Sequence, residues 1–401
     1  MFSQKEPAES NAKIKVIGVG GAGGNAINNM ISADLKGVEF IVANTDVQAL
    51  DLSGAGRKLQ IGDKLTEGLG AGANPEVGRA AAEESAEMIR NALKDSHMVF
   101  ITAGFGGGTG TGAAPVIAEI CKELGALTVA VLTKPFLFEG RKRAKQAEDG
   151  LAQIRQTADT VITIPNDRLR GLASKNATML DMFRKADEIL LHSVKGITDL
   201  IMVPGLVNLD FADVKTTMEK AGLAIMGMGS SDGENRAVEA AERAISHPLL
   251  EDLSINGAKA VLINLTSTSA ITMDEMSDAC TRIYDEVGDD ADIMWGSVID
   301  ESLGDELRIT VIATGIGAED EAPPMRQAPV IGRPRPGTAP RRPVSGTETG
   351  SAPEQPAVPK NTDYLDHKAF DRIKQVMKEG GSGEDGEEDL EIPTFLRKKP
   401  R

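Results

Sequence analysis

The 401-residue chain is poor in cysteine and in aromatic residues, with two Cys and 3% Phe, Trp and Tyr. Cys121 and Cys280 each fall inside an expected helix, without a partner at motif spacing, which excludes a disulfide framework and a cysteine metal site. The four histidines are scattered and predict no metal cluster. No apolar run approaches a membrane span and no signal-peptide pattern opens the chain. We therefore expect a cytoplasmic protein.

Positive charge is also in short supply, because 60 acidic residues outweigh 44 basic ones and leave a net charge of -16. This balance excludes general attraction to nucleic acid or to a membrane surface. The P-loop pattern G-x-x-x-x-G-K-[ST] does not occur, so the ordinary P-loop mechanism is excluded as well. The apolar share of 41% is enough for one large or two ordinary domains with real cores.

Glycine, in contrast, is abundant and gathers in three segments, of which 104–112 is the richest. This segment follows the apolar run 98–103 and precedes a helix expected over 113–124. A strand, a loop almost without side chains and a helix N-terminus together present backbone N–H groups to an anion, and the helix dipole adds positive charge there. The segment predicts a phosphate site that contains Gly106, Gly107, Gly108, Thr109, Gly110 and Thr111.

Apolar strands alternate with helices through the first 175 residues, which predicts a Rossmann-like α/β domain with a parallel sheet covered on both faces. The expected strands are 13–20, 38–43, 98–103, 126–133 and 160–165. In such a sheet the carboxyl ends of the strands lie along one edge, where ligands bind. The three glycine segments, Asn44 to Asp46, the segment from Glu139 to Arg143, and Asn166 should all lie at that edge.

The first glycine segment has an alternative interpretation. Gly18, Gly20 and Gly23 match the dinucleotide pattern G-x-G-x-x-G between a strand and a helix, and Asp46 follows the second strand, where such folds hold a ribose. This pattern predicts an NAD-dependent oxidoreductase. A dehydrogenase does not need the other two glycine segments, however, and no proton donor is recognisable in a substrate domain.

A long helix is expected over 176–202, apolar around much of its circumference and therefore suited to burial between two domains. Phe183 and Asp187 share one face of its first turns. After the helix, Asp210 and Asp213 fit the N-cap and the N3 acid of a further helix, and from the local sequence alone capping is favoured.

The remainder of the chain predicts a smaller α/β domain over 203–317, in which strands 293–299 and 308–314 pair across Gly304 and Asp305. Residues 1–11 are polar and expected to be disordered. Residues 318–386 are rich in proline and polar residues, which predicts a disordered tether. The apolar cluster in the terminal peptide 387–401 predicts a docking segment for a partner.

The segment 106–112 matches the tubulin signature, and 208–213 is similar to the catalytic loop of the same family. Over 12–317, and again over 392–397, the chain resembles the tubulin/FtsZ family of bacterial cell-division GTPases. The resemblance implies GTP or GDP as ligand, with Mg²⁺. The implied nucleotide contacts are Gly20, Gly21, Ala22, Gly23, Gly24, Asn25, Asn44, Asp46, Gly72, Ala73, Gly106, Gly107, Gly108, Thr109, Gly110, Thr111, Glu139, Arg143, Asn166, Phe183 and Asp187.

Helix length constrains the catalytic role of Asn208, Asp210 and Asp213. If Asp187 contacts the base, these residues lie at least fifteen helical residues further on, over ~20 Å away at ~1.5 Å per residue. They are then either caps only or act on the nucleotide of the next subunit, in a head-to-tail contact that generates an open filament. A third possibility is a nucleotide-gated scaffold without enzymatic activity.

The family further implies a division ring at mid-cell beneath the inner membrane. It also implies membrane-anchoring and regulatory partners that bind the terminal peptide. The residues expected to carry this contact are Ile392, Pro393, Phe395, Leu396 and Arg397.

Overall fold

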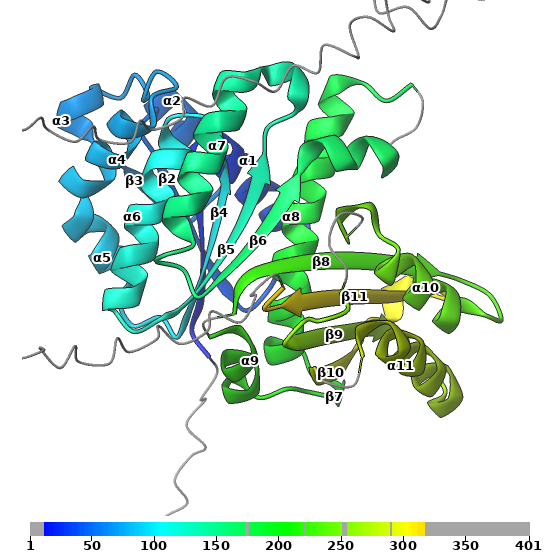
Figure 1. The fold of residues 1–401 in the computed structure, drawn as a ribbon. Coiled ribbons are helices and arrows are strands. Elements are labelled where there is room, and N and C mark those ends of the chain that lie inside the picture. Colours follow the sequence, from blue (N-terminus) through cyan, green and yellow to red (C-terminus); the bar gives the residue numbers. More distant parts are fainter. Residues whose placement is uncertain (1–11, 173–175, 220, 251–254, 289–290, 317–401) are drawn as a thin grey trace, which may run out of the picture. The chain divides into compact units, whose positions relative to one another are not determined.

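The computed structural model describes residues 12–172, 176–219, 221–250, 255–288 and 291–316. The expected disordered N-terminus, the tether and the docking peptide lie outside these ranges. The described part begins with a six-stranded parallel sheet in the order β3-β2-β1-β4-β5-β6 (Figure 1). Its strands are β1 (Ile14–Val19), β2 (Val38–Asn44), β3 (Arg57–Gln60), β4 (Met98–Gly104), β5 (Leu127–Lys134) and β6 (Thr160–Pro165).

Helices cover both faces of this sheet. They are α1 (Gly20–Ser32), α2 (Val47–Asp51), α3 (Asp63–Thr66), α4 (Pro75–Glu84), α5 (Ala86–Leu93), α6 (Thr109–Glu123) and α7 (Arg141–Ile154), with 3-10 turns η1 (Leu137–Glu139) and η2 (Asn166–Leu172). One face packs against α1 and the other against α4 to α7. The expected parallel α/β sheet is confirmed, and its buried strands explain the continuous apolar runs.

The second half begins with the long helix α8 and continues as a mixed sheet. Its elements are α8 (Met179–Met202), β7 (Gly205–Val207), α9 (Phe211–Met218), β8 (Gly222–Ser231), α10 (Arg236–Ile245), η3 (Pro248–Leu250), β9 (Ala260–Ser267), α11 (Met273–Val287), β10 (Asp292–Ile299), η4 (Glu301–Leu303) and β11 (Leu307–Thr314). The strand order is β8-β11-β9-β10-β7, and β8 pairs with β6 over a few residues, so the two sheets are joined.

The expected pairing of the last two strands is wrong. β11 lies between β8 and β9, antiparallel to both, whereas β10 pairs in parallel with β9 and antiparallel with β7. The physical reason is burial, because β11 is apolar and buried along nearly its whole length and requires a neighbour on each side. β10 is partly exposed and lies nearer the edge.

The helix α8 connects the two cores. Its buried residues Ile189, Val194 and Ile197 belong to one apolar cluster with α1, β4 and β5, and the same cluster includes Leu262 and Ile312 of the second half. Figure 1 shows α8 running between the two sheets. The expected burial of this helix between two layers is confirmed, and it fixes which residues lie at each of its ends.

Candidate nucleotide site

Two of the three glycine segments form helix starts. The helix α1 begins at Gly20, directly after β1, whereas the sequence predicts a helix from Ala26. The helix α6 begins at Thr109, after a turn over 105–108, whereas the sequence predicts a helix from 113. The first turn of a helix leaves its N–H groups unpaired, and glycine, which has no side chain, leaves those groups accessible. Gly20 has a φ of 72°, which reverses the chain at the end of β1 without steric cost.

The N-termini of α1 and α6 approach each other closely. A Cβ atom on Gly20 would lie 3.0 Å from the backbone nitrogen of Gly110. A Cβ atom on Gly108 would lie 2.8 Å from the Cβ of Ala71, whereas one on Gly21 or Gly107 would meet nothing within 4 Å. Two helix N-termini therefore open onto one space, and their dipoles add positive potential to it.

This space is a cavity of about 340 Å³ at the carboxyl edge of the sheet. The predicted residues that line it come from β1–α1, β4–α6, η1–α7, η2 and α8. They are Gly20, Gly21, Ala22, Asn25, Gly107, Gly108, Thr109, Gly110, Glu139, Arg143, Asn166, Phe183 and Asp187. Segments that are distant in the sequence thus meet around one concave site.

The other predicted residues do not line the cavity but support its walls. A Cβ atom on Gly23 would lie 2.5 Å from the carbonyl oxygen of Thr102, so this glycine packs α1 against β4, and Gly24 lies at the next, half-buried position. Thr111 accepts a hydrogen bond from the backbone N–H of Gly106 at 2.9 Å, which shapes the turn before α6.

The loop after β2 is held by its own polar side chains. Asp46 caps α2 by accepting hydrogen bonds from the N–H groups of Gln48 and Ala49, and Asn44 accepts from the N–H of Asp46. Asp46 is the residue that the dinucleotide interpretation assigns to a ribose. Its place as a cap outside the cavity weakens that interpretation.

The third glycine segment, between α3 and α4, is a true loop. Gly72 and Ala73 both have positive φ, of 58° and 57°, and the carbonyl of Ala73 accepts a hydrogen bond from Gln146 of α7 at 3.2 Å. The loop lies behind Gly108, whose close approach to Ala71 leaves no room for a side chain.

A carboxylate and a guanidinium group lie at one rim of the cavity. Glu139 accepts a hydrogen bond from the backbone N–H of Phe136 at 2.9 Å and forms an ion pair with Arg143. The Glu139 side chain is 14% exposed and that of Arg143 50% exposed. Glu139 is therefore fixed, whereas Arg143 can turn towards an anion.

The opposite wall combines an aromatic ring with two polar side chains. Phe183 is 39% exposed and packs edge-on against Phe136, with ring centroids 5.6 Å apart. The Oδ1 atom of Asn166 is buried and has no hydrogen-bond partner among the described residues. Burial raises the pKa of Asp187 to about 6. A ring face, an unused acceptor and a desolvated carboxyl group together fit a nucleobase that donates hydrogen bonds.

Several lining residues were not predicted: Val19, Gly104, Phe105, Thr133, Pro135 and Ala186. Most of them are apolar or lack a side chain, so the sequence carries no chemical signal for them. Thr133 is the exception, because it is a hydroxyl near the carboxyl end of β5. Its place at the same edge as the glycine segments could have identified it.

The three predicted catalytic residues lie elsewhere. Asn208, Asp210 and Asp213 are exposed, and none of them lines the cavity. Phe211, beside them, packs against His97 at a centroid distance of 6.0 Å, and His97 directly precedes β4. The start of α9 therefore lies at the amino-end edge of the sheet, and Figure 1 shows α9 at the far end of α8 from the start of α7.

Local hydrogen bonds hold this acidic loop. Asp210 is the N-cap of α9 and accepts from the backbone N–H of Asp213 at 2.9 Å, which confirms the expected capping. Asn208 accepts from the N–H of Gly205 at 2.8 Å and donates to the carbonyl of Val203 at 2.6 Å. The carboxylate of Asp213 has no partner among the described residues, so it is free to bind a molecule from outside.

Metal-binding clusters and membrane-spanning helices are both absent from the described ranges. No group of three or more His, Cys, Asp or Glu side chains in those ranges is arranged to hold a metal ion. None of their helices is both long and apolar enough to cross a lipid bilayer.

Comparison with known proteins decides which nucleotide fold this is. Residues 13–174 match the model of the Tubulin/FtsZ family, GTPase domain, and residues 222–317 match the FtsZ family, C-terminal domain. The chain belongs to the tubulin/FtsZ family. It is a GTPase of the cell-division type, and the nucleotide that fits the cavity is GTP or GDP.

Individual relatives agree with this assignment. The cell division protein FtsZ of Coxiella burnetii is 53% identical over 79% of this chain and 82% of its own length. That of Magnetospirillum gryphiswaldense is 50% identical over 89% of this chain, which spans 63% of that relative's length. An empty FtsZ dimer of M. jannaschii has a TM-score of 0.74 and 46% identity over 77% of this chain and 89% of its own.

Proposed function

We propose that the cavity at the carboxyl edge binds GTP with its phosphates against the first turns of α1 and α6. The backbone N–H groups near Gly21 and Gly107 face open space and supply donors for the phosphate oxygens. Phe183 stacks on the guanine, while Asn166 and Asp187 accept hydrogen bonds from its edge. The unpartnered Oδ1 of Asn166 supports this orientation.

We further propose that the acidic loop of one subunit acts on the nucleotide of the next. The observation that carries this proposal is the separation of the two sites by α8. From Asp187 to Met202 the helix alone spans over ~20 Å, so Asp210 and Asp213 cannot reach the phosphates of their own cavity. A contact between opposite ends of two copies is heterologous and generates an open filament.

Exposed apolar side chains lie near the cavity and near the acidic loop, which supports burial of both in a contact between subunits. At the rim of the cavity, Leu137 and Phe138 are 78% and 63% exposed, and Leu180 is 58% exposed. Beside the acidic loop, Leu206 is 59% exposed. Large apolar side chains that lie together on a surface mark sites of protein contact.

In the assembled site, Asp213 and Asp210 orient and polarise a water molecule for in-line attack on the γ-phosphate, assisted by Asn208. Backbone N–H groups of the α1 and α6 turns stabilise the developing charge. Mg²⁺ suits this site because it takes most of its ligands from phosphates and water, which agrees with the small number of carboxylates near the cavity. Hydrolysis then weakens the contact between subunits and drives polymer turnover.

In the cell, we propose that these filaments form the division ring at mid-cell, beneath the inner membrane. The terminal peptide with Ile392, Pro393, Phe395, Leu396 and Arg397 would bind membrane-anchoring and regulatory partners. These residues lie outside the described ranges, so the proposal depends on their resemblance to the family pattern. Pull-down with the intact chain and with a variant lacking residues 387–401 tests it.

A mixing experiment tests the proposal that the acids act on a neighbour. One variant, Asp213→Ala, keeps the nucleotide cavity but lacks the acid. The other, Gly107→Leu, keeps the acid and fills the phosphate space, where a new side chain meets no atom of the protein. Each variant alone should hydrolyse GTP poorly, and an equimolar mixture should recover a substantial fraction of wild-type turnover.

Three other outcomes would contradict the proposal. Turnover that does not rise with protein concentration, together with failure of the mixture to recover, points to hydrolysis within one subunit. Filaments that form while Asp210→Ala and Asp213→Ala leave turnover unchanged point to a nucleotide-gated scaffold. Binding of NADH in place of GTP points to the oxidoreductase interpretation.

A further inference from the structure

A pair of hydroxyl groups joins the end of β2 to the start of α6. The Oγ1 atoms of Thr45 and Thr109 lie 2.7 Å apart, a normal distance for a hydrogen bond between two hydroxyls. Thr109 is the first residue of α6 and lines the nucleotide cavity, whereas Thr45 directly follows β2 and does not line it. Thr45 therefore reaches the cavity only through Thr109.

The side chain of Thr45 is closed off from water. The residue is 0% exposed, and Thr109 is the only hydrogen-bond partner of its hydroxyl among the described residues. Its backbone is held as well, because the carbonyl oxygen accepts from the N–H of Gly70, in the third glycine segment, at 3.2 Å and from the hydroxyl of Thr66 at 3.3 Å. The hydroxyl oxygen of Thr45 thus has a fixed position beside Thr109.

Burial decides which of the two hydroxyls donates. Each carries one proton, so each can donate one hydrogen bond. If Thr109 donated to Thr45, the proton of Thr45 would lie inside the protein without an acceptor among the described residues, and an unpaired buried donor costs free energy. If Thr45 donates to Thr109, the buried proton is paired and the remaining proton belongs to Thr109, at the cavity. The second arrangement is therefore the more stable one.

The remaining proton of Thr109 lies where the two helix N-termini meet. A Cβ atom on Gly20, the first residue of α1, would lie 3.4 Å from the Cβ of Thr109. A hydroxyl that accepts one hydrogen bond becomes a stronger donor in the next, because the bonds of a chain polarise one another. A bond from such a hydroxyl to a charged phosphate oxygen is stronger than one to a neutral acceptor. Thr109 is thus prepared to donate to an anion.

We propose that Thr45 is a positioning residue for nucleotide binding. Its hydroxyl donates to Thr109, and Thr109 in turn donates to a phosphate oxygen of the nucleotide. This assignment rests on the proposed placement of the phosphates against the first turns of α1 and α6. Thr45 fixes the direction of the Thr109 hydroxyl before the nucleotide arrives, so that less conformational freedom is lost on binding.

Serine and alanine differ by a single hydroxyl and isolate its contribution. Thr45→Ser keeps the hydroxyl and Thr45→Ala removes it, while both lack the methyl group of threonine. Each is made with Thr109 intact and with Thr109→Ala, and affinity for GDP is measured by isothermal titration calorimetry on the full chain. The use of GDP keeps hydrolysis out of the measurement.

The expected result is a coupling between the two positions. Thr109→Ala alone should weaken GDP binding about tenfold or more, as expected for loss of a hydrogen bond to a charged group. With Thr109 intact, Thr45→Ser should bind GDP nearly as well as wild type, and Thr45→Ala about 3- to 5-fold more weakly. With Thr109→Ala, the two variants at position 45 should bind GDP equally. A general packing defect would instead weaken binding in both backgrounds.

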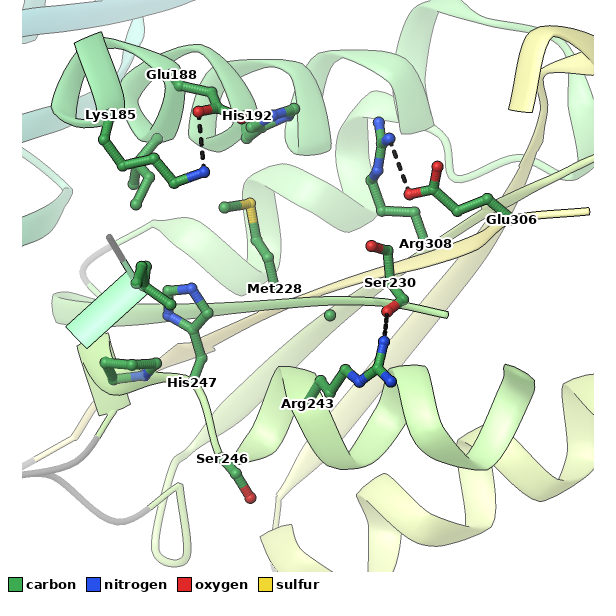
Figure 2. Close-up of a pocket in the computed structure, with 14 residues that line it drawn as sticks. Lys185, Glu188, His192, Met228, Ser230, Arg243, Ser246, His247, Glu306 and Arg308 are labelled. Carbon is green, nitrogen blue, oxygen red and sulfur yellow. Dashed lines mark hydrogen bonds and ion pairs between the residues drawn. The ribbon is translucent and has the colours of Figure 1, made fainter. Parts of the chain in front are cut away.

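Ser230→Ala is the control for loss of a hydroxyl elsewhere in the chain. Figure 2 shows Ser230 beside Arg243 in the wall of a separate cavity, between α8 and the layer of β8 and β11, which shares no lining residue with the nucleotide cavity. Affinity of this variant for GDP should match that of wild type. Thermal unfolding shows whether each variant has folded, and Thr45→Val removes the same hydroxyl if Thr45→Ala does not fold.

The possible failures are distinguishable. No binding of GDP by wild type, or wild-type affinity in Thr109→Ala, would overturn the placement of the phosphates at α6 and the role of Thr45 with it. A tenfold loss in Thr109→Ala together with equal binding by Thr45→Ser and Thr45→Ala would overturn only the role of Thr45. An equal loss from Thr45→Ala in both backgrounds would also overturn it, because the effect would then lie in the packing at the end of β2.

Discussion

The two ends of α8 are built differently. The cavity at its first turns contains the buried, unpartnered Oδ1 of Asn166 and the half-buried carboxyl group of Asp187, whose pKa is raised by burial. The loop beyond its last turn is exposed, and Asn208 and Asp210 are held by local hydrogen bonds. Unpartnered buried groups favour a ligand that pairs with them, whereas an exposed, ordered loop suits contact with another molecule. The first turns of α8 therefore suit ligand binding, whereas the loop beyond its last turn suits contact with another molecule.

The strongest test of this comparison is removal of the free carboxylate at the exposed end. Asp213→Asn should lower GTP turnover by about 100-fold or more, the size of effect expected when a water-orienting group is lost. Affinity for GDP should be unchanged, since Asp213 does not line the cavity. Asp274→Asn, in the first turn of α11, is a control for the loss of a helix-end charge and should keep wild-type turnover. An equal fall in GDP affinity would show that the two ends are not separate.

The second test introduces a steric conflict into the wall of the nucleotide cavity. In Gly108→Ala the new Cβ would lie 2.8 Å from the Cβ of Ala71 and 2.9 Å from the nitrogen of Asn74, which caps α4. We expect a loss of about 1–3 kcal/mol in the free energy of unfolding of the nucleotide-free chain. Gly107→Ala meets no atom within 4 Å and should unfold like wild type. Denaturant titration measures both, and equal stability would mean that the loop yields without strain.

The sequence predicts the residues of the nucleotide cavity better than it predicts the helix starts and the strand order around them. Apolar runs such as 98–103 specify buried parallel strands, and parallel strands bring their carboxyl ends together, so most of the cavity follows from the pattern. The starts of α1 and α6 were missed because glycine favours loops in general but is tolerated where a helix begins. The position of β11 between β8 and β9 depends on burial from both sides, which no local pattern encodes.

The third test uses pH to change the protonation of Asp187 in the nucleotide cavity. Because burial raises the pKa of Asp187 to about 6, lowering the pH from 6 to 5 protonates it in the empty chain, and an acid group that is protonated loses its acceptor role towards guanine. Affinity for GDP should fall by up to about tenfold over that unit, and this slope should vanish in Asp187→Asn.

The same shift has the opposite sign for the stability of the empty chain. The pKa of Asp187 is higher in the folded than in the unfolded chain, where it is about 3.9, so the folded state binds more protons between these values. Relative to Asp187→Asn, wild type without nucleotide should therefore become more stable as the pH falls from about 6 to 4. Thermal unfolding of wild type and Asp187→Asn at a series of pH values, with and without GDP, measures both effects. Parallel dependence of stability on pH in the two proteins would contradict the raised pKa of Asp187.

The smallest expected effect separates the two roles of Asp210. As the N-cap of α9 it needs only an oxygen that accepts from the N–H of Asp213, and asparagine supplies one as well as aspartate does. Asp210→Ala should therefore cost about 1 kcal/mol of stability, while Asp210→Asn should cost almost nothing. If the carboxylate also polarises water for a neighbouring subunit, both variants should lose turnover. Thr272→Ala removes the cap of α11 and should lose stability but keep turnover. Turnover that followed stability across all three variants would reduce Asp210 to a cap.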